Sequence, residues 1–109
     1  MLYKRLKNRI KKNEGYSNKP YQDQLGFYTI GYGHLIKEKE ENYFKKKFTK
    51  NHFERVFEKD FKIAEKQYKK FFYNRIHSSS EKELLIEMLF QLGFKGVSKF
   101  KRMLYFINK

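Results

Sequence analysis

The sequence contains no cysteine, which excludes disulfide bridges and thiol chemistry and says little about the cellular compartment. It also has no long apolar run at its beginning, where MLYKRLKNRIKKN mixes apolar residues with basic ones. This beginning therefore has the pattern of neither a secretory signal peptide nor a transmembrane segment.

Acidic residues are scarce, with 12 Asp and Glu against 26 Lys and Arg, and the formal net charge is +14. A field of one sign attracts polyanions over about 10 Å in ordinary salt, so nucleic acid, anionic lipid and acidic cell-wall polymer are candidate partners. The coding bias of an AT-rich genome would also explain part of this charge. Because the basic residues are spread along the chain without a recognisable nucleic-acid-binding module, we expect no specific nucleic-acid partner.

Aromatic side chains, by contrast, are plentiful. Of the 109 residues, 39% are hydrophobic and 19% are aromatic, and each Phe or Tyr removes a large apolar area from water. This content suffices for one modest core, while the length leaves no room for two ordinary ones. We therefore predict a single domain over residues 1–109.

Apolar residues at helical spacing predict two amphipathic helices in the first three quarters of the chain. The apolar stripe of the first consists of Leu2, Leu6 and Ile10. This helix should end at Gly15, a natural C-terminal cap. The second helix is expected from about Lys50 to Asn74, with Thr49 as its N-terminal cap. Between them, the charged block from Glu38 to Phe48 is either a short helix or a solvated connector.

The last third of the sequence predicts two further helices. Ser80 and Glu83 fit the S-x-x-E capping box, in which each side chain bonds to the backbone amide of the other residue. The helix that they begin has a wide apolar face from Leu84 to Leu92 and should end at Gly93. After a turn, a last helix is expected from about Ser98 to Ile107.

Between Pro20 and His34 the period of the apolar pattern changes to two, which predicts a small hairpin or short antiparallel sheet. Asp23 and Gly26 stand first and last in a type I turn signature. One face of the following strand should carry Phe27, Thr29, Gly31 and Gly33, and the other Tyr28, Ile30, Tyr32 and His34. A face with so few side chains makes sense if a ligand or another backbone approaches it closely.

Glu14 and Asp23 are candidates for a catalytic pair, because glycoside hydrolysis can use one protonated carboxylic acid and one carboxylate. Glu14 would lie at the negative end of a helix, which disfavours its charged form, whereas Asp23 opens a polar turn. The many lysines nearby would favour ionisation of both. From residue types and spacing alone, a helix-end glutamate and a turn-forming aspartate are the simpler interpretation. The bare face beside Thr29, whose hydroxyl could hold a water, favours a ligand site.

Together these residues resemble the active-site segment of phage-type lysozymes, glycoside hydrolase family 24. The similar positions are Glu14-Gly15, Tyr21-x-Asp23 and Gly26-x-Tyr28-Thr29-Ile30-Gly31-x-Gly33-His34-Leu35. Further similar positions are Thr49-Lys50, Phe57 to Asp60, Met88 to Gly93, Gly96-Val97 and Arg102-Met103-Leu104. The resemblance therefore covers nearly the whole chain, and the spacing of Glu14, Asp23 and Thr29 equals that of the family's catalytic triad.

The resemblance implies a lysozyme that cuts the β-1,4 bond between N-acetylmuramic acid and N-acetylglucosamine of peptidoglycan, with inversion. Glu14 would protonate the leaving oxygen, while Asp23 and Thr29 would hold and activate a water on the opposite face of the sugar. No metal and no cofactor is implied.

The resemblance also implies roles for residues outside this triad. Gly33, Leu35 and Phe90 match substrate-binding positions of the family. His34 and Asp60 match a structural ion pair between the sheet region and the long helix, so we keep His34 out of catalysis. The other two histidines, His52 and His77, are expected on the surface.

The fold implied by the resemblance is α+β and mainly helical, with a small β-hairpin or sheet lobe, a long connecting helix and a helical lobe. The helical lobe would be shortened, because the chain ends at Lys109 where family members continue through several more helices. The resemblance further implies a monomer made in the host cytoplasm, which a holin-type lesion would release to the cell wall. Its charge would attach it to the anionic cell envelope.

A second class of function stays open, that of a catalytically inactive basic protein that binds the cell envelope or perturbs membranes. A basic amphipathic helix such as the first one can lie on a membrane. Its single apolar stripe, however, favours packing onto the rest of a small domain.

Overall fold

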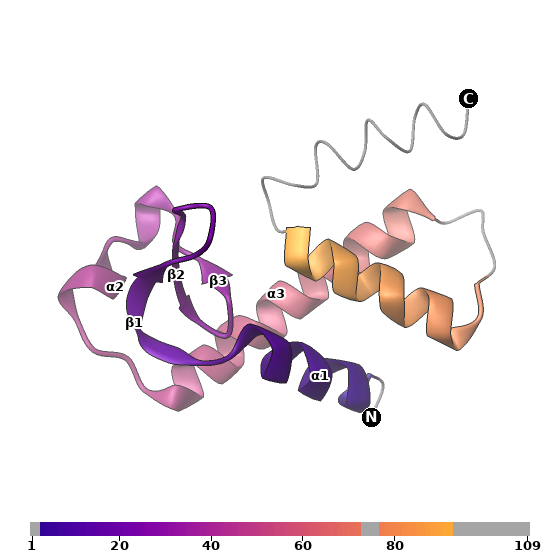
Figure 1. Ribbon diagram of the computed structural model, residues 1–109, viewed down its shortest axis with the longest axis horizontal. Helices are drawn as coiled ribbons and strands as arrows, with labels where there is room; N and C mark the ends of the chain where they lie inside the picture. Colours follow the sequence, from indigo (N-terminus) through magenta and orange to yellow (C-terminus); the bar gives the residue numbers. More distant parts are fainter. Residues whose placement is uncertain (1–2, 73–76, 93–109) are drawn as a thin grey trace. The chain divides into compact units, whose positions relative to one another are not determined.

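The computed structural model of the protein describes residues 3–72 and 77–92, which fall into two units, Met1–Asp60 and Phe61–Lys109. The elements in chain order are α1 (Lys4–Glu14), β1 (Ser17–Gln22), β2 (Tyr28–Gly31), β3 (His34–Leu35), a 3-10 helix (Glu38–Glu40), α2 (Asn42–Lys45) and α3 (Lys50–Phe71) (Figure 1). A further helix covers residues 79–92. The predicted mainly helical α+β class is confirmed. No helix in these described ranges is long and apolar enough to cross a membrane.

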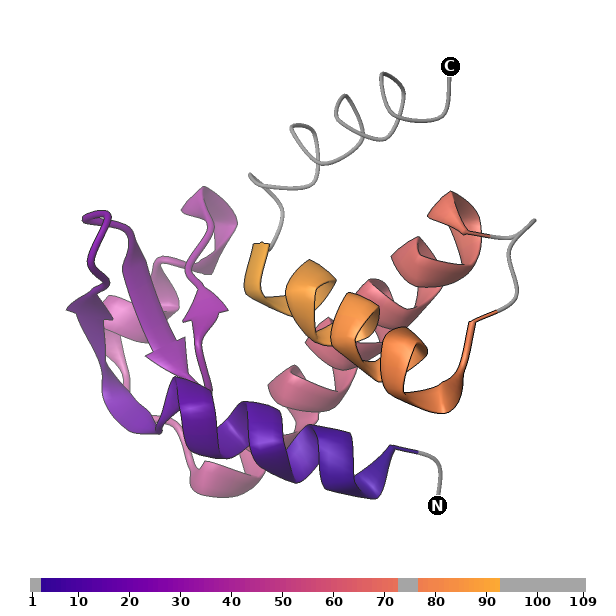
Figure 2. The ribbon, with the colours of Figure 1, turned by 45° about the vertical axis from the view of Figure 1, so that its right-hand side comes forward.

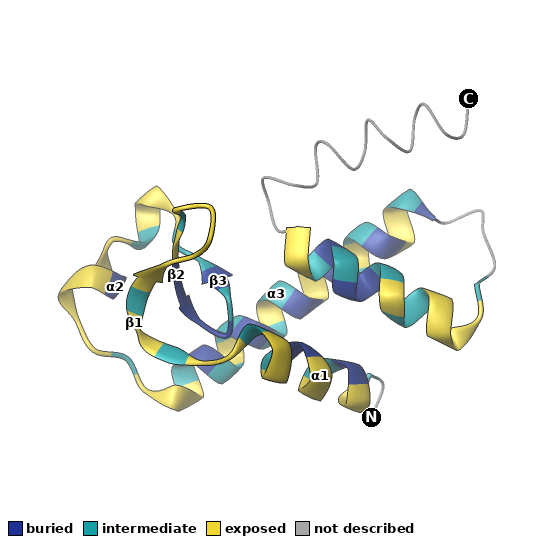
Figure 3. Cartoon of the chain, viewed as in Figure 1, coloured by how far each residue is buried: buried dark blue, intermediate teal, exposed yellow. Residues whose placement is uncertain are grey.

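Helix α1 ends where the sequence predicts. Leu6 and Ile10 are completely buried. Figure 3 shows that one side of α1 is buried and the other is exposed. At the C-terminal end, Gly15 has a φ of 74° and donates its backbone N–H to the carbonyl of Lys11 at 2.9 Å. With a ψ of −174°, Gly15 lies outside the αL region of the usual glycine cap, in a conformation of positive φ that glycine adopts far more readily than other residues. The predicted helix therefore forms, with Leu2 outside the described residues.

The long helix α3 also begins at its predicted residue. The hydroxyl oxygen of Thr49 accepts the backbone N–H of His52 at 3.2 Å, which satisfies one of the free donors in the first turn. The residues buried along the helix are Phe53, Phe57, Phe61, Ala64 and Tyr68. They follow the predicted spacing of three and four. The helix ends at Phe71, and the predicted end at Asn74 lies outside the described residues.

The charged block after the sheet contains two short helices, the 3-10 helix and α2, so both predicted alternatives are partly correct. Tyr43 on α2 is buried against Ile30 of the sheet and Phe53 of α3, with Ile36 and Phe48 partly buried beside them. Tyr43, with Phe48 beside it, therefore ties this mostly exposed segment to the core.

The sheet has three antiparallel strands in the order β1-β2-β3 (Figure 2). Its register places Tyr21 opposite Thr29, and Thr29 opposite Leu35. Residues directly opposite each other in an antiparallel sheet project from the same face. Tyr21, Thr29 and Leu35 thus form one row across that face.

The predicted strand alternation up to His34 is wrong beyond Gly31. Strand β2 ends there, the chain turns through Tyr32 and Gly33, and β3 begins at His34. Gly31 and Gly33 have φ values of 65° and 77°, which are not strand conformations. A Cβ at Gly31 would lie 2.8 Å from the ring of Phe53. The space beside Gly31 is therefore filled by a side chain of this protein, not left for a ligand.

The helix over 79–92 uses a different capping box from the predicted one. The backbone N–H of Glu81 donates to the hydroxyl of Ser78 at 3.2 Å, and the N–H of Ser78 donates to the Glu81 carboxylate at 3.1 Å. The box is therefore Ser78-x-x-Glu81, two residues before the predicted Ser80-x-x-Glu83. The predicted turn and last helix beyond Gly93 lie outside the described residues.

Replacing Ser78 by Ala is expected to lower the free energy of unfolding by about 1 kcal/mol, the usual loss for an N-terminal cap. Ser80→Ala is the matched control, because Ser80 lies inside the helix and its change should stay within about 0.5 kcal/mol. Urea unfolding followed by circular dichroism measures both. A larger loss for Ser80→Ala would favour the box predicted from the sequence.

Candidate active site

The side chain of Glu14 lies against Gly33. Glu14 is the last residue of α1, and a Cβ built on Gly33 would lie 2.9 Å from its Cδ and 3.2 Å from its Cγ. A side chain at position 33 would collide with the carboxyl group, because real Cβ contacts are longer than this. The bare backbone of Gly33 therefore receives Glu14, and its predicted contact with substrate stays a prediction.

Asp23 is held rigidly at the start of the turn between β1 and β2. Its Oδ1 accepts the backbone N–H groups of Leu25 and Phe27, each at 2.9 Å. Its backbone carbonyl accepts the N–H of Gly26 at 3.0 Å, so the predicted turn is present. Since Oδ1 takes both side-chain bonds, the orientation of the carboxylate is fixed and Oδ2 is the oxygen left to meet a water.

Thr29 is 5% exposed in the middle of the three-stranded row. Its hydroxyl donates to the carbonyl of Phe27 at 3.1 Å, which leaves the lone pairs of the hydroxyl oxygen as acceptors. Leu35 is half-buried next to it on β3. The sheet thus brings the predicted catalytic Thr29 beside the predicted substrate-binding Leu35.

Both predicted catalytic carboxylates act on one tyrosine. Burial and then the charges of Glu14 and Asp23 raise the pKa of Tyr21 above its ordinary value. The charges of both carboxylates therefore reach Tyr21, which lies opposite Thr29 in the same row of the sheet.

His34 is buried between two carboxylates. Its Nδ1 lies 2.8 Å from Oδ2 of Asp60, the residue with which the sequence predicts a pair, and its Nε2 lies 3.0 Å from both oxygens of Glu40. A carboxylate only accepts hydrogen bonds, so both contacts form when both ring nitrogens carry a proton. Burial lowers the pKa of His34, but the bonds and charges of Asp60 and Glu40 outweigh it and raise that pKa overall.

The free energy of unfolding is therefore expected to depend on the charge of His34. A raised pKa means that this stabilisation is complete below about pH 6.5, the ordinary value, and is lost as the pH rises through the folded value. Urea unfolding at a series of pH values above 6.5 should show this loss, and His34→Gln should remove the slope. An unchanged slope in His34→Gln would contradict the assignment.

The pKa of His52 is shifted in the opposite direction to that of His34, so His52 serves as a comparison. Burial and then the charges of Arg55 and Lys59 lower the pKa of His52, so its contribution is lost as the pH falls. His52→Gln should therefore remove a loss of stability as the pH falls below about 6.5 and leave the loss above 6.5 unchanged. A changed slope above 6.5 in this variant would contradict the assignment of that loss to His34.

The expected surface position of His52 and His77 is only partly correct. Both are half-buried, and each is hydrogen-bonded to a tyrosine. His52 Nε2 lies 2.8 Å from the hydroxyl of Tyr43, and His77 Nδ1 lies 2.7 Å from the hydroxyl of Tyr68. A single sequence gives no pattern for such pairs, because each joins residues nine positions apart across a loop or helix end.

A second polar cluster ties the end of α1 to α3. Lys11 donates to Oε2 of Glu54, and the hydroxyl of Tyr32 donates to Oε1 at 2.8 Å. The bond from Lys11 holds the pKa of Glu54 below its ordinary value against the effect of burial. Burial and the bond to Glu54 raise the pKa of Tyr32 to about 12. This cluster holds the last turn of α1, and with it Glu14, in place.

Phe90 belongs to the second unit, where it is half-buried on the helix over 79–92. Its predicted contact with substrate stays a prediction. Within the described parts of both units, no group of three or more acidic or histidine side chains could hold a metal ion.

Two residues of this region were given no role from the sequence, although Tyr21 stands in the motif that resembles the family. Glu40 stands in a block of charged residues, where no pattern distinguishes it from its neighbours. Tyr21 precedes Asp23 by two positions, and the alternation of a strand would have placed both on one face. That signal was present in the sequence.

Comparisons with known proteins bear on the same residues. A family model described as Phage lysozyme matches residues 11–108, which include every residue discussed for the site. A protein of Dictyostelium discoideum named "Probable T4-type lysozyme 2" is 33% identical over 128 residues, covering 95% of this chain and 75% of that protein.

Proposed function

The chain belongs to the phage lysozyme family of glycosidases, and we propose that it cleaves the β-1,4 bond between N-acetylmuramic acid and N-acetylglucosamine of peptidoglycan with inversion. The observation that carries the proposal is the placement of two carboxyl groups from different elements on one small sheet: Glu14 lies against Gly33 in the turn between β2 and β3, and Asp23 is fixed in the turn between β1 and β2, the strand of Thr29. Two carboxyl groups on either side of one sugar ring are what this hydrolysis requires.

In this proposal Glu14 is the general acid. The carboxyl group of Glu14 packs against the backbone of Gly33. The last turn of α1, which carries Glu14, is tied to α3 by the hydrogen bond from Lys11 to Glu54. Glu14 gives its proton to the glycosidic oxygen as the bond to the anomeric carbon breaks. The rigid support matters because the proton must already point at the leaving oxygen when the bond lengthens.

Asp23 and Thr29 supply the attacking water. Two backbone amides hold Oδ1 of Asp23, so Oδ2 can take a proton from the water, while the Thr29 hydroxyl oxygen accepts the second water hydrogen. The water oxygen then bonds to the anomeric carbon on the face opposite the leaving group, which inverts that carbon. For this route the carboxyl groups should stand about 6.5–9.5 Å apart, leaving room for the water.

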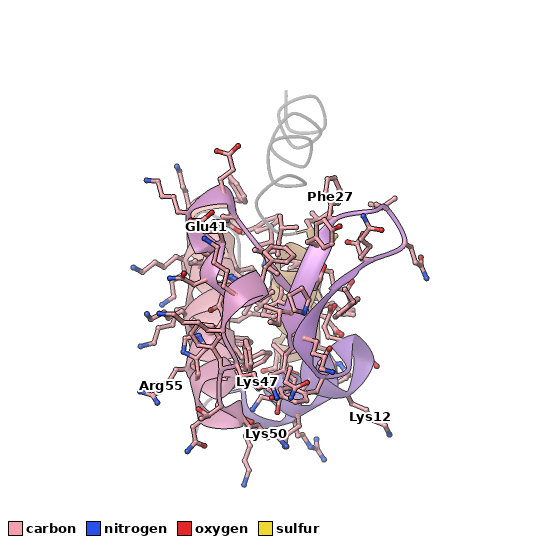
Figure 4. All side chains as sticks on the ribbon, turned by 90° about the vertical axis from the view of Figure 1, so that its left-hand side faces the viewer. Lys12, Phe27, Glu41, Lys47, Lys50 and Arg55 are labelled. Atoms are coloured by element: carbon pink, nitrogen blue, oxygen red, sulfur yellow. The ribbon has the colours of Figure 1, made fainter. Side chains whose placement is uncertain are left out.

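The positive charge supports attachment to an anionic envelope polymer. Exposed basic side chains project from the first unit in Figure 4, among them Lys12, Lys47, Lys50 and Arg55. Attachment through such charges weakens as salt screens them. The relative from Dictyostelium discoideum means that family membership does not assign the chain to a phage, so holin-dependent release and host lysis stay predictions.

The experiment that tests the function uses purified peptidoglycan and the full chain. New reducing ends should appear at N-acetylmuramic acid, and nuclear magnetic resonance of the fresh product should show the α-anomer first, because an inverted β-bond gives α. Appearance of the β-anomer first would contradict inversion. Absence of reducing ends at any salt concentration would contradict the function.

A parallel sample of anionic lipid vesicles without peptidoglycan tests the alternative function. The hydrolase should release no dye from them. Dye release together with absence of new reducing ends would instead favour a membrane-perturbing basic protein.

A further inference from the structure

Glu54 on α3 is bonded to two separate segments of the first unit. Its Oε2 accepts a hydrogen bond from Lys11 in the last turn of α1, and its Oε1 accepts one at 2.8 Å from the hydroxyl of Tyr32, in the turn between β2 and β3. The same two segments carry Glu14 and Gly33. The proposed function uses the bond from Lys11 and gives the bond from Tyr32 no role.

On the α1 side, Lys11 lies in the same helical turn as Glu14. The two residues are three positions apart, which makes them neighbours on the helix surface. The backbone carbonyl of Lys11 also accepts the N–H of Gly15 at 2.9 Å, so Lys11 belongs to the turn that ends directly after Glu14. The bond from the Lys11 side chain to α3 therefore restrains the helix end from which Glu14 projects.

On the sheet side, Tyr32 directly precedes Gly33 in the turn. A Cβ on Gly33 would lie 2.9 Å from Cδ of Glu14, so the backbone at this position contacts the carboxyl group. The ring of Tyr32 is buried and packs edge-on against Phe57 of α3, with 5.8 Å between the ring centroids. The bond from the Tyr32 hydroxyl to α3 therefore restrains the turn that meets Glu14.

Both oxygens of Glu54 are suited to hold these donors. The bond from Lys11 lowers the pKa of Glu54 against the effect of burial, so the carboxylate is ionised at neutral pH and each oxygen is an acceptor. The ammonium of Lys11 also lies 4.9 Å from the ring centroid of Phe57 and 5.2 Å from that of Tyr32. Cation–π attraction therefore adds to the ion pair.

We propose that Glu54 is a positioning residue of the hydrolase, whose two carboxylate oxygens fix the end of α1 and the β2–β3 turn against each other and so keep the Glu14 carboxyl group against Gly33. The inference rests on the proposed function. A general acid must direct its proton at the leaving oxygen, and a misplacement of about 1 Å can cost roughly 100-fold in rate. Glu54 limits such a misplacement because neither segment can move away from α3 without breaking a bond to it.

Glu58 provides a matched control on the same two helices. It lies four positions after Glu54 on α3 and is likewise paired with a lysine of α1, Lys7 at 2.8 Å. The side chains of Glu58 and Glu54 are 44% and 37% exposed, so the two ion pairs are similarly open to solvent. Within the described residues, Glu58 makes no bond to the β2–β3 turn. The bond from Tyr32 is therefore what distinguishes Glu54.

Glu54→Met removes both acceptor oxygens and is expected to lower kcat roughly tenfold with little change in KM, because the loss affects the transition state. Glu58→Met should leave kcat unchanged, while urea unfolding should show similar losses of stability in the two variants. Equal losses of kcat would overturn the inference, since loosening of α1 against α3 would then explain them.

Tyr32→Phe is a second variant that removes one hydroxyl and keeps the ring packed against Phe57. Only one of the two bonds to Glu54 is lost, so kcat should fall by a smaller factor than in Glu54→Met, again with little change in KM. An unchanged kcat in Tyr32→Phe would overturn the part of the inference that concerns the β2–β3 turn.

A measurement without substrate separates this inference from the proposed function. The nuclear Overhauser effect between the γ protons of Glu14 and the α protons of Gly33 reports their contact. It should weaken in Glu54→Met and persist in Glu58→Met. An unchanged effect in Glu54→Met would overturn the inference, even where the original protein cleaves peptidoglycan. A weakened effect, where the original protein shows no cleavage, would support the positioning by Glu54 and overturn only the proposed function.

Discussion

Glu14→Gln is expected to lower the rate of peptidoglycan cleavage by roughly 10²- to 10⁴-fold, the range that a positioned general acid contributes. Glutamine has nearly the shape of glutamic acid and can occupy the space above Gly33, but it has no proton to give to the leaving oxygen. The fold should be retained, as judged by circular dichroism and urea unfolding. The reducing-end assay on purified peptidoglycan gives the rate.

Glu58→Gln is the matched control for this loss of one negative charge. Glu58 lies on α3 and forms an ion pair with Lys7 at 2.8 Å, with 44% of its side chain exposed. Loss of such a pair should change stability by no more than about 1 kcal/mol and leave cleavage unchanged. If Glu14→Gln cleaves as fast as Glu58→Gln, Glu14 is not the acid.

Gly33→Ala is expected to reduce cleavage by roughly 100-fold, because its Cβ would occupy the position of the Glu14 carboxyl group and displace it. The methyl group adds a second penalty, since φ at this position is 77°, where an L-residue is disfavoured by about 1–2 kcal/mol. Activity and the free energy of unfolding should therefore fall together. The reducing-end assay and urea unfolding measure the two effects.

Gly26→Ala is the matched control that separates the cost of a positive φ from the displacement of the Glu14 carboxyl group. Its φ of 86° imposes a similar penalty, but a Cβ there meets no atom within 4 Å. We expect a similar loss of stability and nearly unchanged cleavage. Full activity in Gly33→Ala would mean that Glu14 does not depend on this contact for its position.

The parts of the fold that follow from local chemistry were predictable from the sequence. Gly15 ends α1 because glycine adopts a positive φ at little cost, and Thr49 begins α3 because its hydroxyl can accept a free backbone donor. Each of these signals depends on residues only a few positions apart.

Signals that were ambiguous locally were resolved by contacts at longer range. Three serines in a row offer two equally good capping boxes, and the sequence alone does not choose between Ser78 and Ser80. Likewise, the alternation from Tyr28 to His34 is compatible with one long strand. The chain turns at Gly31 because the ring of Phe53 from α3 takes the space beside it.

The same distinction applies to the candidate site. The types and spacing of Glu14, Asp23 and Thr29 suggested a hydrolase only with the help of the family resemblance. In the structure, the side chains of the candidate site are held by residues distant in sequence. Glu14, for example, packs against Gly33, and no periodic pattern in the sequence links these two positions. For His34, the contact with Glu40 depends on a fold of the chain through the 3-10 helix.

The long-range ion pairs and hydrogen bonds of the first unit also affect how quickly it folds. Its ion pairs and hydrogen bonds join residues 51 positions apart for Lys7 and Glu58, and 26 apart for His34 and Asp60. Contacts of such separation require long loops to close before they stabilise anything, which slows folding. Lys7 and Lys11 of α1 are tied to Glu58 and Glu54 of α3, so during synthesis the ribosome must deliver Glu58 before these ties can hold Glu14 in its proposed catalytic position.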